Sequence, residues 1–273
     1  MQGVVAVDGK TVCHSHDRSK DKSAIHVVSA WACEHSVALG QVKVNDKSNE
    51  MTAIPELLRT PDLKGCLVTI DAMGCQAVIA KNIVEAHADY LLAVNGNQET
   101  LADDVEQEFK QAMTDDFAHM DCLYYETLDK GHGRIEKRQY WYTHDIHGLG
   151  TLERCHTLAW MAMCRASRTI NGETSTGERY FITTCTHNNV EKIAAAVRSH
   201  WGIENSLHWI LDVAFLEEQS RIRIGYAAEN MAAIRKIALN ILKNNQSKKG
   251  GVKAKRLQAG WDDGYLEEIL LAM

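Results

Sequence analysis

A short stretch in the last third of the chain gathers residue types that can do chemistry. Residues 200–215 read HWGIENSLHWILDVAF and place His200, Glu204 and His208 four residues apart, among two tryptophans. On an α-helix this spacing puts the three side chains on one face. Such a face could bind a metal ion, present a catalytic carboxylate, or pack as an ordinary aromatic helix against a core.

Two further acids follow apolar segments that are typical of strands. GVVAVDGK predicts a strand that ends at Asp8, with a turn signal at Asp8-Gly9, and GCLVTIDAMG predicts a buried strand that ends at Asp71. Ligands collect at strand ends in α/β sheets, and two such aspartates facing a glutamate would make an all-oxygen site for Mg²⁺ or Mn²⁺. Each acid also has a simpler interpretation, because Asp8 could sit in a hairpin turn, Asp71 could cap a helix, and Glu204 could be satisfied by its neighbouring histidines.

A zinc site on the same helix is the competing interpretation. His200, Glu204 and His208 are possible zinc ligands, but the chain has no HExxH and no CxxC, and the HDIH at 144–147 is a weak source of a further ligand. Histidines that support the helix are the simpler explanation.

The remaining periodicities predict an α/β protein. Strands are expected over 23–33, 37–44 and 89–95, and helices over 75–88, 97–113, 188–215 and 226–244. Residues 115–185 differ, with several short strands between turns, and this segment is interpreted as a β-rich insertion. The order of elements predicts a mixed sheet covered by helices.

Composition narrows the class of protein. The 273 residues are 45% hydrophobic and 24% charged, no apolar run approaches a membrane span, and no signal peptide is expected, so we predict a cytoplasmic protein without a membrane partner. A net charge of −6 argues against a protein that coats nucleic acid non-specifically. The run 243–256 carries six basic residues and no acid, which usually indicates a solvated loop and sometimes a phosphate-contacting patch.

Motifs along nearly the whole chain carry a more specific signal. In order they are AVDGKT, HVVSAWA, KSNEMTAIPELL, TIDAMGCQ, LLAVNGNQ, GHGRIEKR, HWGIENSLHWILDVAF and AAENMAAIRKIALNIL. Together they resemble the insertion-sequence DDE transposases of the H-repeat-associated group. That family's catalytic domain has the ribonuclease H-like fold, a mixed sheet flanked by helices, here with the β-rich insertion before the last catalytic helix.

The resemblance implies a site and a reaction. Asp8, Asp71 and Glu204 would be the catalytic triad that holds two Mg²⁺ or Mn²⁺ ions, for cleavage of insertion-sequence ends and their transfer to target DNA. A homodimer in a synaptic complex is the expected assembly. DNA contacts are expected from basic residues near the triad and in the insertion, namely Lys10, Arg134, Arg138, Arg198, Arg221 and Arg223. The catalytic helix would be supported by largely buried tryptophans and by polar neighbours, namely His200, Trp201, Asn205, His208 and Trp209.

The resemblance also predicts how the chain is divided. Residues 1–114 would form the first part of the core, 115–185 the insertion, 186–245 the catalytic and closing helices, and 246–273 a basic linker and tail. Relatives carry a further segment before AVDGKT, so this chain is expected to lack it. A truncated remnant that only binds DNA or a transposase partner is therefore the main alternative, ahead of a zinc-dependent hydrolase.

Overall fold

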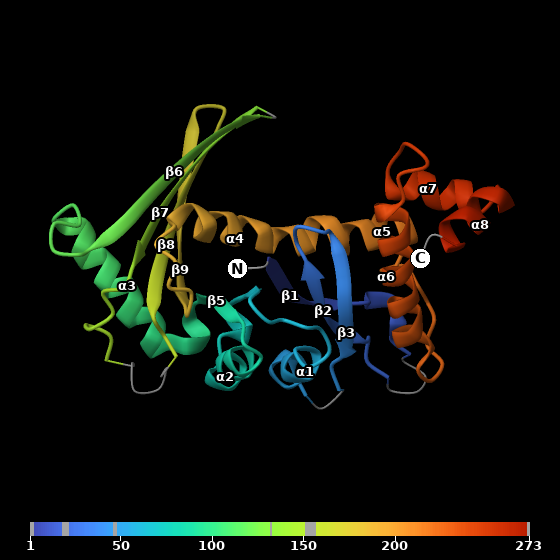
Figure 1. The fold of residues 1–273 in the computed structure, drawn as a ribbon, viewed down its shortest axis with the longest axis horizontal. Coiled ribbons are helices and arrows are strands. Elements are labelled where there is room, and N and C mark those ends of the chain that lie inside the picture. The colour runs from blue at the N-terminus through green and yellow to red at the C-terminus, as the bar shows by residue number, and fades with distance from the viewer. Residues whose placement is uncertain (1–2, 18–21, 46–47, 132, 151–156, 272–273) are drawn as a thin grey trace. The chain divides into compact units, whose positions relative to one another are not determined.

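The structure is a computed structural model that describes residues 3–17, 22–45, 48–131, 133–150 and 157–271 (Figure 1). The chain divides into two compact units. We call Met1–Val4 with Leu63–Ser199 the central unit, and Val5–Asp62 with His200–Met273 the terminal unit. Each unit is described by itself.

The terminal unit contains a three-stranded antiparallel sheet. Its strands are β1 (Val4–Thr11, whose first residue belongs to the central unit), β2 (His26–Ala32) and β3 (Val37–Lys43). The predicted strands over 23–33 and 37–44 are confirmed. In the register of β1 with β2, Asp8 lies opposite Ser29 and Lys10 opposite Val27. Because side chains alternate along a strand, Asp8 and Lys10 project from the same face of this sheet.

Helices complete the terminal unit. They are α1 (Glu50–Leu57), the end of α4 (Val190–Ile203), a π-turn (Glu204–His208), α5 (Trp209–Phe215), α6 (Ala227–Asn244), α7 (Val252–Ala259) and α8 (Asp263–Leu271). A short 3₁₀ turn (Cys13–Ser15) follows β1. The predicted helix over 226–244 is confirmed.

The basic run 243–256 departs from the predicted loop. Its second half lies in α7, where Lys255 is buried and donates to the carbonyl oxygens of Leu242 at 3.2 Å and Asn245 at 2.6 Å. A lysine that binds the carbonyls at the end of α6 stabilises that end of the helix. The segment predicted as a linker and tail therefore holds two helices.

The central unit combines parallel and antiparallel strands. Its elements are β4 (Leu67–Ile70), α2 (Ala77–Glu85), β5 (Asp89–Val94), α3 (Glu99–Thr114), β6 (Cys122–Gly131), β7 (Arg134–Thr143), β8 (Trp160–Ile170) and β9 (Glu173–Thr183), with most of α4. Strands β4 and β5 are parallel, whereas β5–β9–β8–β7–β6 are successively antiparallel. Short turns (Ala72–Gly74 and Gly96–Gln98) precede α2 and α3. These residues form a mixed α/β structure.

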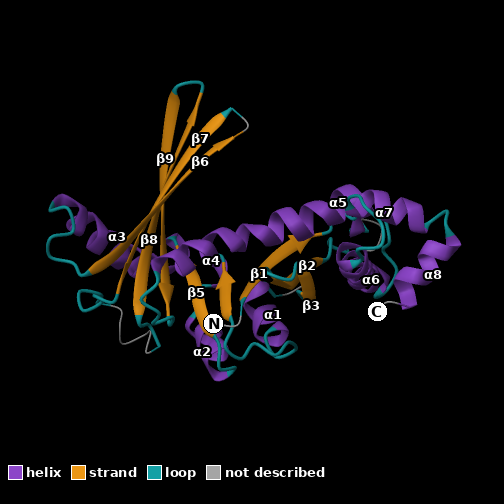
Figure 2. Ribbon diagram, turned by 45° about the horizontal axis from the view of Figure 1, so that its top comes forward, coloured by secondary structure: helices purple, strands orange, loops and turns teal. Residues whose placement is uncertain are grey.

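The β-rich segment differs from its prediction in strand length. Strands β6 to β9 have ten or eleven residues each, where short strands are expected. Their distal halves are largely exposed, and Figure 2 shows them extending beyond α3. We call these distal halves, residues 126–131, 133–138 and 165–178, the arm.

None of the helices within the described residues is long and apolar enough to cross a bilayer.

Candidate functional site

Asp8 lies inside β1 rather than at its end. The prediction of a strand that ends at Asp8 is wrong, because β1 continues to Thr11 in register with β2. The side chain is half-buried, and its Oδ1 accepts the N–H of Gly9 at 2.8 Å. Its Oδ2 lies 3.4 Å from Nδ1 of His208. Pairing with β2 overrides the turn preference of Asp-Gly, so this acid is carried by a regular strand.

His208 meets Asp8 as a neutral ring. Burial, followed by the positive charges of Lys10 and Lys236, lowers the pKa of His208 to about 3. The imidazole is therefore uncharged near neutral pH, and its contact with Asp8 is polar rather than an ion pair. A neutral ring beside a carboxylate does not cancel its charge, which leaves Asp8 able to attract a cation.

Glu204 begins a π-turn that interrupts the helix. The N–H of Trp209 donates to the carbonyl of Glu204, five residues earlier, so residues 204–208 are wound more loosely than an α-helix. Glu204 is exposed, whereas His208 is half-buried against Asp8 and His200 is half-buried. The three side chains therefore do not share one environment, although their spacing places them along one side of the helix. Single-turn π-helices occur frequently at functional sites.

The two tryptophans beside Glu204 are not the residues that seat its helix. Trp201 is 38% exposed and Trp209 is 60% exposed, so the prediction that both are largely buried is wrong. Asn205 is also exposed, and its side-chain amide donates to the carbonyl of Trp201 at 3.0 Å within the same helix. Other side chains must therefore hold the Glu204 helix in place.

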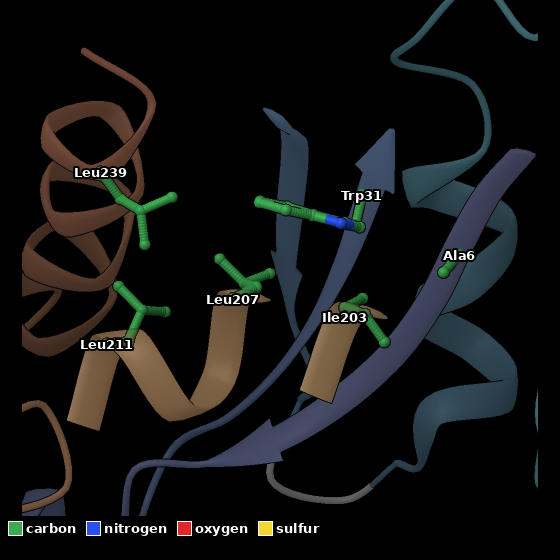
Figure 3. Close-up of a cluster of buried hydrophobic side chains, with 6 residues drawn as sticks. All are labelled: Ala6, Trp31, Ile203, Leu207, Leu211 and Leu239. Atoms are coloured by element: carbon green, nitrogen blue, oxygen red, sulfur yellow. The ribbon is translucent and has the colours of Figure 1, made fainter. Parts of the chain in front are cut away.

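An aliphatic stripe and a tryptophan of β2 provide that support. Ile203, Leu207 and Leu211 are fully buried against Trp31, which is 1% exposed. Figure 3 shows them converging between β1, β2 and α6, with Ala6 and Leu239 completing the cluster. The sequence carries a signal for this stripe, since the three aliphatic residues recur every four positions.

Asp71 lies in the central unit, directly after β4. It caps the following turn, and its Oδ1 accepts the N–H groups of Met73 at 3.1 Å and Gly74 at 3.4 Å. The strand-end position and the cap were predicted as alternatives, and both are present. Backbone donors on one carboxylate oxygen fix the orientation of the group.

The three acids are thus distributed over two units. Asp8 and Glu204 belong to the terminal unit and Asp71 to the central unit. Within the described residues, no group of three or more His, Cys, Asp or Glu side chains is gathered as a metal site. The donor chemistry nevertheless suits Mg²⁺ or Mn²⁺, because three carboxylates supply only hard oxygen ligands.

The predicted DNA-binding residues fall into four groups. Arg221 is exposed, and the neighbouring Arg223 donates from Nε to the carbonyl of His14 at 3.3 Å, which fixes the loop after α5. Arg198 is exposed on the central-unit part of α4. Lys10 is enclosed by protein partners, as described below. The last group, Arg134 and Arg138, lies on the arm.

Arginines gather on one face of the arm. Arg134, Arg138 and Arg168 surround Glu136: Nε of Arg134 lies 2.8 Å and Nε of Arg168 3.9 Å from its Oε1, and Arg138 contacts its Oε2. The strand register places Arg179 on the same face. Sequence reasoning missed Arg168 and Arg179, because the shared face depends on the register of four strands.

The opposite face of this sheet packs against a helix near its base. Helix α3 packs there through Phe109, whose ring stacks on Tyr180 with centroids 6.1 Å apart. This helix carries five acidic residues and one lysine. The part of that face that α3 covers is therefore acidic.

Comparison with known proteins defines the class. Residues 1–241 match the model of the transposase DDE domain, and the chain belongs to this family. It is 42% identical over 275 residues to the putative transposase YncI of Escherichia coli O157:H7, and 40% identical over 277 residues to the H repeat-associated putative transposase YhhI of E. coli K12. These alignments cover 98% of this chain, 68% of YncI and 71% of YhhI. The resemblance that the motifs predict is confirmed.

Proposed function

We propose that this chain is the catalytic part of an insertion-sequence transposase, and that Asp8, Asp71 and Glu204 are its triad. The observation that carries the proposal is the family match over residues 1–241, which includes all three acids. The π-turn supports it, because Glu204 begins the turn whose last residue, His208, touches Asp8. The antiparallel β1–β2–β3 followed by the parallel pair β4–β5 is consistent with a ribonuclease H-like core.

The three carboxylates would hold two Mg²⁺ or Mn²⁺ ions. When bound, a pair of such ions stabilises the attacking and leaving oxygens of an in-line phosphoryl displacement. The protein orients the ligands: Gly9 and His208 hold Asp8, and Met73 and Gly74 hold Asp71. In the first reaction water attacks the phosphodiester at the end of the element and releases a 3′-hydroxyl. In the second, that hydroxyl attacks a phosphodiester of the target DNA, forms a new phosphodiester bond and displaces a 3′-hydroxyl of the target strand.

DNA would be bound by two basic surfaces, one on each unit. On the central unit it is the arginine face of the arm with Arg198, and on the terminal unit the loop that carries Arg221 and Arg223. Gathered arginines allow a chain of net charge −6 to bind phosphates locally. Two copies of the chain in a synaptic complex would align two element ends.

A cleavage assay tests the proposal. Purified chain is incubated with a supercoiled plasmid that carries element ends, with Mn²⁺ or with EDTA, and nicked and joined products are separated on gels. We expect Mn²⁺-dependent nicking that falls by at least ~10²-fold in Asp71→Asn and Glu204→Gln, because each removes a charged ligand of the ions that would stabilise the reacting phosphate. The matched control is Glu191→Gln, which removes an exposed carboxylate from α4. Binding of end DNA without any ion-dependent cleavage would instead favour a non-catalytic remnant.

A further inference from the structure

Lys10 has its partners inside the terminal unit. Its ammonium contacts the carboxylate of Asp212, donates to the carbonyl of His208 at 3.2 Å and lies 3.9 Å from Oε2 of Glu217. The side chain is only 14% exposed. These contacts join β1 to the π-turn, to α5 and to the chain that follows α5.

Leaving these partners for a DNA phosphate would be costly. Glu217 is 1% exposed, and Nη1 of Arg235 lies 3.8 Å from its Oε1. Breaking one half of a buried ion pair strands the other charge in a poorly solvated place. The geometry thus favours an internal role for Lys10 over the DNA contact that the sequence predicts.

The residues that Lys10 holds are themselves fixed. Leu216 adopts a left-handed conformation (φ 53°) at the end of α5, and the N–H of Glu217 bonds back to the carbonyl of Leu211 at 3.1 Å. This closure ends α5 and aims Glu217 inward. Asp212 and Glu217 thereby present two carboxylates from a rigid helix end to one lysine of β1.

Lys10 therefore links the two proposed ligands of the terminal unit. It lies two residues after Asp8 on the same face of β1. Its hydrogen-bond acceptor, the carbonyl of His208, belongs to the last residue of the turn that begins at Glu204. A π-turn can relax to α-helical winding by shifting one residue, which would rotate Glu204 relative to the buried stripe. Lys10 opposes that shift, because it binds both His208 and Asp212.

We infer that Lys10 is a positioning residue that fixes the π-turn against β1 and so sets Glu204 relative to Asp8. The consequence for metal ions rests on the function proposed above. Because Lys10 holds the π-turn in place, its loss should misplace Glu204 and so weaken ion binding as well as loosen the turn. Groups that orient metal ligands typically contribute ~10–100-fold to metal affinity.

The test compares Lys10→Met with Lys10→Arg and Lys22→Met in the full chain. Lys22 is a matched control, since its ammonium also binds two main-chain carbonyls of the terminal unit, those of Arg223 at 2.6 Å and Gly225 at 3.2 Å. Amide hydrogen exchange over residues 203–212 reports the turn, and Mn²⁺ titration followed by electron paramagnetic resonance reports the ligands. If Lys10→Met does not fold, Lys10→Met with Asp212→Asn removes both charges of the pair.

The expected result is selective. Exchange over 203–212 should accelerate at least ~10-fold and Mn²⁺ affinity should fall at least ~10-fold in Lys10→Met, with recovery in Lys10→Arg and little change in Lys22→Met. Equal effects of Lys10→Met and Lys22→Met, or unchanged exchange in Lys10→Met, would overturn the inference. A wild-type chain that takes up no Mn²⁺ would count against the proposed function, while the exchange comparison would still decide the role of Lys10.

Discussion

At the residue scale, the indole that matters to the Glu204 helix is Trp31. It lies on β2 and packs against Ile203, Leu207 and Leu211 in the core of the terminal unit. Trp209, on the Glu204 helix itself, is largely exposed. Trp31→Ala should lower the free energy of unfolding by ~3–5 kcal/mol, because it opens a cavity in a packed cluster. Trp209→Ala should change it by only ~0.5 kcal/mol, as is usual for exposed positions. Urea denaturation of both variants measures this difference, and equal losses would contradict the assignment.

Lys236 makes a second residue-scale prediction, for pH. Burial lowers the pKa of Lys236 to about 8, and its ammonium donates to Oε1 of Gln41 at 2.7 Å. Its unfolded pKa is ~10.4, so between the two values the unfolded chain binds more protons and this group adds stability as pH rises. Below pH 8 the cost of burying the charge is fully present.

The difference between wild type and Lys236→Met isolates that effect. Above pH 8, the free energy of unfolding of wild type should rise relative to that of the variant by up to ~1.4 kcal/mol per pH unit. The control is Lys81→Met, on the exposed side of α2, for which the difference should stay flat. Urea denaturation at several pH values gives both curves, and a flat curve for Lys236→Met would sink the prediction.

At the element scale, both faces of the arm carry basic side chains, and the arginines around Glu136 lie on one of them. Arg168 lies on the arginine face, and Lys137 projects from the opposite face one register position away, where it pairs with Glu126 at 3.0 Å. If the arginine face contacts phosphates, Arg168→Ala should reduce the slope of log K against log salt by ~0.9. Lys137→Ala removes the same charge and should leave the slope unchanged. Fluorescence anisotropy with duplex DNA at several salt concentrations measures both, and equal slopes would remove the arginine face from the DNA path.

Helices and strands could be predicted from the sequence where the hydrophobic pattern of their own residues determines them. Strands β2 and β3 and helix α6 follow from periodicity within their own residues. The end of β1 did not, because pairing with β2 carries the strand through Asp8-Gly9. The π-turn that begins at Glu204 has no local signature. The arginine face depends on the alignment of distant strands.

At the scale of the whole molecule, the candidate triad spans both units. Motifs and residue types led to Asp8, Asp71 and Glu204 as candidates, and all three lie inside the family match. The residues that surround these acids could not be predicted from motifs in the same way. The neutral His208 beside Asp8 and the anchored Lys10 are products of burial in the terminal unit. Composition alone could not predict where a basic surface lies, because a net charge of −6 gives no information about the arginines on the arm.

The central claim is that Asp8, Asp71 and Glu204 surround the same ions, and iron-directed cleavage of the chain tests it most directly. Fe²⁺ replaces Mg²⁺ or Mn²⁺ at oxygen sites, and with ascorbate and peroxide it generates radicals that cut the nearby backbone. Peptide mapping by mass spectrometry should find three sets of cuts, near residues 8, 71 and 204, all suppressed by excess Mn²⁺ and all lost together in Asp71→Asn. Cuts near residues 8 and 204 that persist in Asp71→Asn, with none near residue 71, would contradict a shared site.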